Sequence, residues 1–216
     1  MKKISSLAVI TLLVSATTTF SQTKIALTGG VSFSNIFSKE EGNTTKLNNK
    51  TGITGGIQVD IPAGNHLSIQ TGLNFVQKGS HDKRNIMGQQ FKYDLTLNQL
   101  EIPLNVVYNS NHKKGSFFIG AGPAIGYNLS GSYSLEYGMM KEEGKLHFGN
   151  DPEKMKHIDA GANVTTGYRF ANGIFMSVNY NRGFSNLSNE LYTGYEEKVT
   201  TQYFGVRLGY QFGNKK

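Results

Sequence analysis

The stretch Tyr203-Phe204-Gly205-Val206-Arg207-Leu208-Gly209-Tyr210-Gln211-Phe212 alternates between two kinds of side chain. Every second residue is apolar, from Phe204 to Phe212, and glycine, arginine and glutamine stand between them. Successive side chains of a β-strand point to opposite faces, so this stretch predicts a strand with one apolar and one polar face. Such a strand separates two environments, as it does in a soluble sandwich or in a membrane barrel. The choice between them depends on the rest of the chain.

The same alternation recurs along the chain between connectors of two lengths. Short turns at 62–65, 109–115 and 171–173 alternate with long polar loops at 38–49, 79–92, 130–156 and 185–199. Short turns facing the periplasm and long loops facing outward are typical of outer-membrane barrels. We therefore predict an all-β fold, an eight-stranded antiparallel up-and-down transmembrane β-barrel whose last strand closes against the first. The expected strands are 24–36, 51–61, 67–78, 93–108, 117–127, 157–170, 174–184 and 203–212.

Aromatic residues lie near both ends of the predicted strands, as the two girdles of a membrane barrel require. One further feature departs from the simple pattern. Leu95 and Leu97 have the opposite parity to Leu100, which predicts a β-bulge near Asn98 and Gln99. The girdle residues are Tyr108, Phe117, Phe170 and Phe212 near the turns, and Phe33, Phe75, Tyr127 and Phe184 near the loops.

The start of the chain is typical of a secretory signal peptide. A charged Met1-Lys2-Lys3 precedes the apolar run 7–14, and the small residues Thr19 and Ser21 precede Gln22. We expect residues 1–21 to be this signal peptide and residues 22–216 to be one outer-membrane β-barrel domain. The predicted location is the cell outer membrane, reached by export.

Composition excludes several classes of function. The 216 residues include no cysteine, so disulfides, thiol catalysis and cysteine-ligated zinc are excluded. The net charge is +7, but the lysines and arginines form no basic stripe, and we predict no nucleic-acid partner. Their scatter suits contact with outer-membrane lipid and lipopolysaccharide, or simply a solvated surface.

Four pieces of sequence together resemble the PorT-like family of outer-membrane β-barrels from Bacteroidetes-type bacteria. The resemblance covers about residues 24–212 and implies an eight-stranded barrel in a Gram-negative cell envelope. The namesake of the family takes part in protein secretion across the outer membrane, so the resemblance implies an accessory role in secretion. The pieces are 67–73 with Gln77-Lys78-Gly79, Leu100-Glu101-Ile102-Pro103-Leu104, Ala121-Gly122-Pro123 with Gly126-Tyr127, and Asp159-Ala160-Gly161 with 180–183.

Two sets of residues are candidates for a functional role. An eight-stranded barrel is filled by its own side chains, and buried charges need partners. We therefore expect Glu101, Asp159, Arg169 and Arg207 to form one ion-pair network in the lumen, which either stiffens the barrel or lines a gated path. The long third loop carries Tyr133, Tyr137, Met139, Met140 and Phe148. These residues suit a partner-binding loop, or a loop that covers the rim of its own barrel.

Enzyme chemistry has only weak support in the sequence. His147 and His157 flank the third loop near Glu142, Glu143 and Asp151, but no spacing fixes a Ser-His-acid group or a metal site. We predict no catalytic residue, cofactor or metal. The expected function is an interaction or scaffold protein of the cell envelope. The alternatives are a lipid-modifying enzyme of the outer leaflet and a narrow small-solute channel.

Overall fold

The computed structural model describes residues 23–40, 43–46, 48–86, 88–110, 115–151, 154–189 and 198–213. The expected signal peptide, residues 1–21, lies outside the described residues, as do 111–114 and 190–197 of the expected connectors. No helix in the described ranges is long and apolar enough to cross a membrane.

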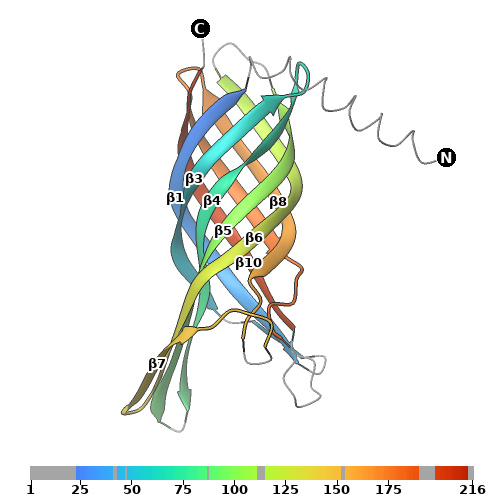
Figure 1. Cartoon of the computed structure of the whole chain (residues 1–216). Coiled ribbons are helices and arrows are strands. Elements are labelled where there is room, and N and C mark those ends of the chain that lie inside the picture. The colour runs from blue at the N-terminus through green and yellow to red at the C-terminus, as the bar shows by residue number, and fades with distance from the viewer. Residues whose placement is uncertain are drawn as a thin grey trace, which may run out of the picture.

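Eight long antiparallel strands form a closed barrel (Figure 1). The last strand pairs with the first over a long register, from Ala26 opposite Gln211 to Lys39 opposite Lys198. The predicted fold and its closing strand are therefore confirmed. The barrel strands are β1 (Lys24–Glu40), β3 (Asn48–Pro62), β4 (Leu67–Ile86), β5 (Gln89–Asn109), β6 (Gly115–Tyr137), β8 (Ile158–Phe170), β9 (Ile174–Gly183) and β10 (Lys198–Gln211). Two shorter strands, β2 (Asn43–Lys46) and β7 (Met140–Leu146), pair with β1 and β6.

The barrel has an apolar exterior and a polar interior. Along β5 the side chains of Ile102, Leu104 and Val106 are 52–60% exposed, while those of Glu101 and Asn105 are at most 2% exposed. Water would penalise such an exterior, whereas lipid solvates it. Both predicted aromatic girdles lie on this exterior, and all their members except the half-buried Phe75 are exposed.

Three of the four expected long loops are wrong, because much of their sequence is strand. In the first, 38–49, β1 continues to Glu40, β2 covers Asn43–Lys46 and β3 begins at Asn48. Strand β4 continues to Ile86 and β5 already begins at Gln89, so only residues 87–88 separate them. Strand β6 continues to Tyr137 and turns back into β7. The outer parts of β4, β5, β6 and β7 form a four-stranded sheet that projects from one side of the barrel mouth (Figure 1). We call this the sheet extension; it comprises residues 79–86, 89–97, 131–137 and 140–146.

The predicted bulge lies where it was expected, but on the neighbouring strand. The register of β5 against β6 slips between Asn98 and Gln99, and the additional residue is Leu129 of β6. The alternation of β5 itself is unbroken, so Leu95 and Leu97 point inward like Gln99 and Glu101. They are apolar because the interior itself becomes apolar at this level. There they pack with Ile36 in a small hydrophobic cluster.

Candidate functional site

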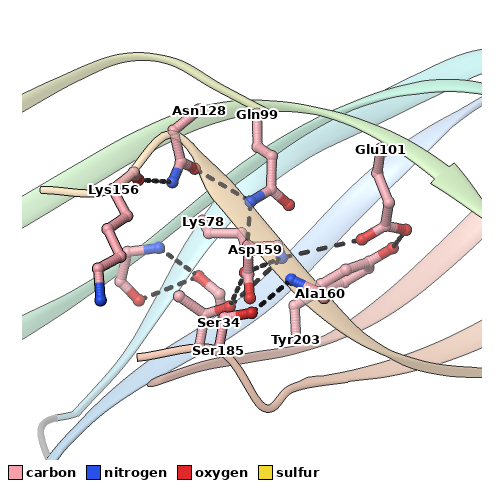
Figure 2. A network of polar contacts seen from close by, with 12 residues as sticks. Ser34, Lys78, Gln99, Glu101, Asn128, Lys156, Asp159, Ala160, Ser185 and Tyr203 are labelled. Carbon is pink, nitrogen blue, oxygen red and sulfur yellow. Dashed lines mark hydrogen bonds and ion pairs between the residues drawn. The ribbon is translucent and has the colours of Figure 1, made fainter. Parts of the chain in front are cut away.

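A buried lysine organises the middle of the lumen (Figure 2). Lys78 points inward from β4, between the buried residues Val76 and Ser80. Its Nζ lies 3.3 Å from Oδ2 of Asp159 and 3.8 Å from Oε2 of Glu101, and all three side chains are at most 2% exposed. The ammonium group thus bridges two carboxylates, on β8 and β5, and we call these three residues the Lys78 cluster.

Polar neighbours hold both carboxylates in place. The Tyr203 hydroxyl donates a 2.6 Å hydrogen bond to Glu101, and Arg207 donates from Nη2 to the same hydroxyl at 3.2 Å. The Thr201 hydroxyl and the Gln99 amide both donate to Oδ2 of Asp159, at 2.6 and 3.3 Å. Hydrogen bonds of this kind offset the cost of burying the charges, so the cluster suits a rigid strut across the lumen.

Glycine makes room for the cluster on β6, the strand between β5 and β8. A Cβ added at Gly126 of β6 would lie only 2.3 Å from Cδ of Gln99. The absence of a side chain there lets Gln99 lie flat, where its amide also reaches Oδ1 of Asn128 at 3.0 Å. Gly126 therefore leaves room for the Gln99 side chain, whose amide donates a hydrogen bond to Asp159.

A second charged group lies nearer the short turns. Arg169 of β8 pairs with Asp60 of β3 at 3.2 Å, and Gln70 and Gln211 donate to the same carboxylate at 3.0 and 2.8 Å. The Arg169 guanidinium also lies over the rings of Phe118 and Phe175, at 5.3 and 5.8 Å from the centroids. Those two rings pack with Ala26 and Val107 in an apolar cluster that fills this end of the interior.

The structure divides the expected lumen network into these two groups. It brings Glu101, Asp159 and Arg207 together, but through Lys78 and Tyr203, which sequence reasoning missed. It places Arg169 apart from them, with Asp60. Lys78 was missed because a loop was expected from residue 79, so the inward position just before it went unnoticed. The signal was present, because Lys78 has the parity of Val76 and of the inward Asn74.

Three of the four pieces of sequence quoted above supply the three residues of the Lys78 cluster. Lys78 comes from the first, Glu101 from the second and Asp159 from the fourth. The third contributes Gly126, which faces Gln99. These short stretches, which lie far apart in the sequence, therefore come together around one group of buried charges.

The residues of the expected partner-binding loop have different environments. Tyr133 and Phe148 pack against the hydrophobic cluster of Ile36, Leu95 and Leu97, which covers the outer mouth of the lumen. Tyr137 is half-buried near the end of β6. Met139 and Met140 lie at the tip of the sheet extension, where they are 104% and 75% exposed. Tyr133 and Phe148 thus cover part of their own barrel, as one alternative expected, whereas the exposure of Met139 and Met140 leaves the partner-binding role a prediction.

The phenol hydroxyl of Tyr133 lies next to a carboxylate. It donates a 3.0 Å hydrogen bond to the Glu142 carboxylate on β7. This bond, together with the negative charge of Glu142, raises the pKa of the Tyr133 phenol above its ordinary value. The phenol therefore stays protonated and links β6 to β7 across the sheet extension.

One of the two histidines considered for hydrolase chemistry, His157, has structural contacts. The ring of His157 stacks on Tyr127 at 4.8 Å between centroids, and its Nδ1 lies 3.1 Å from the backbone oxygen of Asn128. Phe148 packs on the same ring, 5.4 Å away. Within the described residues, no three acidic or histidine side chains gather closely enough to hold a metal ion.

Comparison with known proteins agrees with this architecture. The family described as "Outer membrane protein beta-barrel domain" matches residues 20–189. Among curated protein sequences, none matches this chain significantly.

Three solved structures of bacterial outer-membrane proteins are similar to this chain. OprG from Pseudomonas aeruginosa is 13% identical, with a TM-score of 0.45, over 88% of this chain and 95% of that one. Ail, the attachment invasion locus protein of Yersinia pestis, is 14% identical, with a TM-score of 0.43, over 88% and 98%. Neisserial surface protein A is 10% identical, with a TM-score of 0.42, over 88% and 97%. Such low values say nothing about function, so the family match is the informative comparison.

Proposed function

Because this chain belongs to the outer membrane protein β-barrel domain family and is an integral barrel of the outer membrane, we propose that it acts there as an interaction or scaffold protein. The working surface is the sheet extension, and the barrel is its anchor. Small outer-membrane barrels place their short turns in the periplasm and their long connections outside. The sheet extension lies opposite the short turns and therefore faces the exterior of the cell (Figure 1).

The observation that carries this proposal is the exposed tip of the sheet extension. Met139 and Met140 are 104% and 75% exposed there, whereas the other apolar side chains in the described part of the sheet extension are at least partly buried. Methionine is a flexible, polarizable apolar side chain that adapts to the surface of a partner. An exposed apolar tip on a projecting arm suits contact with another protein.

The lumen supports a structural role for the barrel. Lys78 and Arg207 lie among Glu101 and Asp159, and Arg169 lies against Asp60, so each inward charge has an opposite or polar neighbour. Apolar clusters lie toward both ends. This arrangement supports a filled, rigid barrel more than a channel, and the ring contacts of His157 support a structural role for that side chain.

In our proposal the main partner is another protein of the cell envelope. The barrel also contacts the surrounding lipid and lipopolysaccharide. The resemblance to the PorT-like family of Bacteroidetes-type bacteria supports an accessory role in protein secretion. This role would use the sheet extension to hold a second component at the cell surface.

The proposal is tested by purifying the protein from its own outer membrane in mild detergent, after cross-linking, with identification of the proteins that accompany it. We expect one or more envelope proteins in stoichiometric amount. Changing Met139 and Met140 together to serine should remove them, whereas changing both to leucine should retain them, because leucine preserves the apolar surface. The proposal would be contradicted if the serine variant recovered the same amount of these envelope proteins as wild type. It would also be contradicted if only lipopolysaccharide accompanied the wild-type protein.

A further inference from the structure

The outward face of the sheet extension contains a groove with a volume of about 620 Å³. Four strands line it, with Lys50 from β3, Asp94 and Thr96 from β5, Ser132 from β6, and Glu143 and Lys145 from β7. These six residues define what we call the outward groove. Tyr133, Ser134 and Gly144 also line it, so the groove combines two cations and two carboxylates with several hydroxyl groups, a set that suits a polar ligand.

The groove faces away from the barrel axis because of strand alternation. Leu95 and Leu97 point inward to the hydrophobic cluster, so Asp94 and Thr96 point outward. Ser132 and Lys145 lie opposite each other in the register of β6 and β7, next to the pair Tyr133 and Gly144. Since Tyr133 packs inward, Ser132 and Lys145 lie on the outward face.

Lys50 reaches the groove by crossing over a whole strand. The register of β3 against β4 slips by one residue between Asn49 and Thr54, and Lys50 lies in this irregular segment. Its side chain passes over Gly79, where an added Cβ would lie 2.9 Å from the Lys50 Cδ. The Nζ atom then lies 2.7 Å from the Thr96 hydroxyl and 3.2 Å from the Asp94 carboxylate. A side chain at position 79 would block this path, so the glycine and the slip together place a lysine in the groove.

The groove lies at the depth of the lipid headgroups. Leu129 is the last outward apolar side chain of β6, and Ser132 follows three residues later. Three residues of strand rise about 10 Å along the strand, or about 7 Å in height at the tilt of a barrel strand. The polar layer on each side of a bilayer is about 5–8 Å thick. The groove therefore begins where hydrocarbon gives way to charged and sugar groups.

Cations exceed carboxylates on this outward face. Among the described residues, the carboxylates Asp94, Glu136 and Glu143 each pair with one lysine, at 3.2, 3.0 and 2.7 Å. Two lysines remain in excess. The lysines of this face are Lys50, Lys83, Lys92, Lys141 and Lys145. A net positive surface at this depth complements a layer that carries phosphate groups.

We propose that the outward groove binds the phosphorylated sugar headgroup of the outer-leaflet glycolipid, lipopolysaccharide. Lys145 and Lys50 bind its phosphate, and Ser132, Thr96 and Glu143 form hydrogen bonds with its sugar hydroxyls. This inference rests on the proposed function for its orientation, with the sheet extension outside the cell. It goes further by naming the site and the lipid chemistry. Bound glycolipid would also fix the angle at which the sheet extension leaves the membrane.

The test compares binding of two probes to the folded protein in detergent by native mass spectrometry. The probes are lipid A with two phosphates and the same lipid A without them. Wild type should prefer the phosphorylated form. Changing Lys50 and Lys145 to glutamine should weaken that binding by about five-fold for each lysine removed. The matched control is Lys198→Gln, an exposed lysine on β10 that lies outside the groove.

Each outcome decides the inference. Equal binding of the two probes by wild type would overturn it, as would an unchanged affinity of the Lys50 and Lys145 double variant or an equal loss in Lys198→Gln. The heat-dependent gel shift of each variant confirms that it is folded. If the double variant keeps its lipid but loses a co-purified protein, the groove is a protein site and the lipid inference fails. If the variant with Met139 and Met140 changed to serine keeps its protein partners, the proposed function fails, but the lipid-binding inference for the outward groove is unaffected.

Discussion

Replacing Lys78 by methionine should destabilise the barrel by about 3–5 kcal/mol, because it leaves two buried carboxylates without their cation. Methionine fills most of the space of the lysine stem, so the change isolates the charge. Coulomb attraction over 3.3 Å to Asp159 and 3.8 Å to Glu101 amounts to about 5 and about 4 kcal/mol at an effective dielectric constant near 20. Desolvation of the ammonium group offsets part of this sum, which leaves the smaller net figure.

The measurement is unfolding by urea in lipid vesicles, followed by circular dichroism, since the chain contains no tryptophan. The gel shift between heated and unheated samples gives a second readout. The matched control is Lys92→Met, because the Lys92 and Glu136 side chains are each 37% exposed. An exposed pair of this kind contributes about 0–1 kcal/mol.

A combined variant separates loss of charge balance from loss of packing. Adding Glu101→Gln and Asp159→Asn to Lys78→Met removes the uncompensated charges and should recover most of the lost stability. The reasoning is refuted if Lys78→Met unfolds at the urea concentration of wild type. It is also refuted if the triple variant is no more stable than Lys78→Met, because the loss would then come from packing.

Four further outcomes follow from the same structure. Tyr203→Phe removes the hydroxyl between Glu101 and Arg207 and should cost about 1–3 kcal/mol in urea unfolding; a neutral effect would mean that the hydroxyl is not needed there. Arg207→Leu should cost less than Lys78→Met, because Arg207 donates to an uncharged hydroxyl, and the reverse order would contradict this. Gly122→Ala should cost about 1–3 kcal/mol, since its Cβ would lie 1.9 Å from the Leu104 oxygen, whereas Gly29→Ala, with nothing within 4 Å, should unfold like wild type. The raised pKa of Tyr133 favours the neutral phenol in the folded protein, so its contribution to stability is complete below the ordinary value of 10.0 and is lost as pH rises through the folded value; tyrosinate absorbance of wild type minus Tyr133→Phe should show one phenol that titrates late.

Period-two alternation was enough to predict the barrel, because a membrane barrel repeats one physical requirement on every strand. Each strand must be apolar toward lipid, so the outward Ile102, Leu104 and Val106 and the inward Glu101 could be assigned without coordinates. The same rule failed beyond the membrane. There the exterior faces water and the interior is apolar, so Leu95 and Leu97 point inward to the hydrophobic cluster.

The pairing of inward charges could not be predicted from parity. Parity tells which face a side chain lies on, but it does not give the height of one strand relative to another around a tilted barrel. Arg169 therefore pairs with Asp60, from a distant part of the sequence, and not with the other expected members of its network. The outward groove was hidden for a related reason, because it depends on Lys50 crossing a neighbouring strand at Gly79.

The additional residue in β6 gives that strand two phases. Before it, the even-numbered Phe118, Ala124 and Asn128 point inward; after it, the odd-numbered Gly131 and Tyr133 do. Inserting or deleting one residue between Leu129 and the hairpin tip would exchange inside and outside for everything beyond the change. Adding or removing two residues in both strands of the hairpin, β6 and β7, would keep every side chain on its present face. The sheet extension can therefore become longer or shorter only in steps of two residues per strand, while the barrel stays the same.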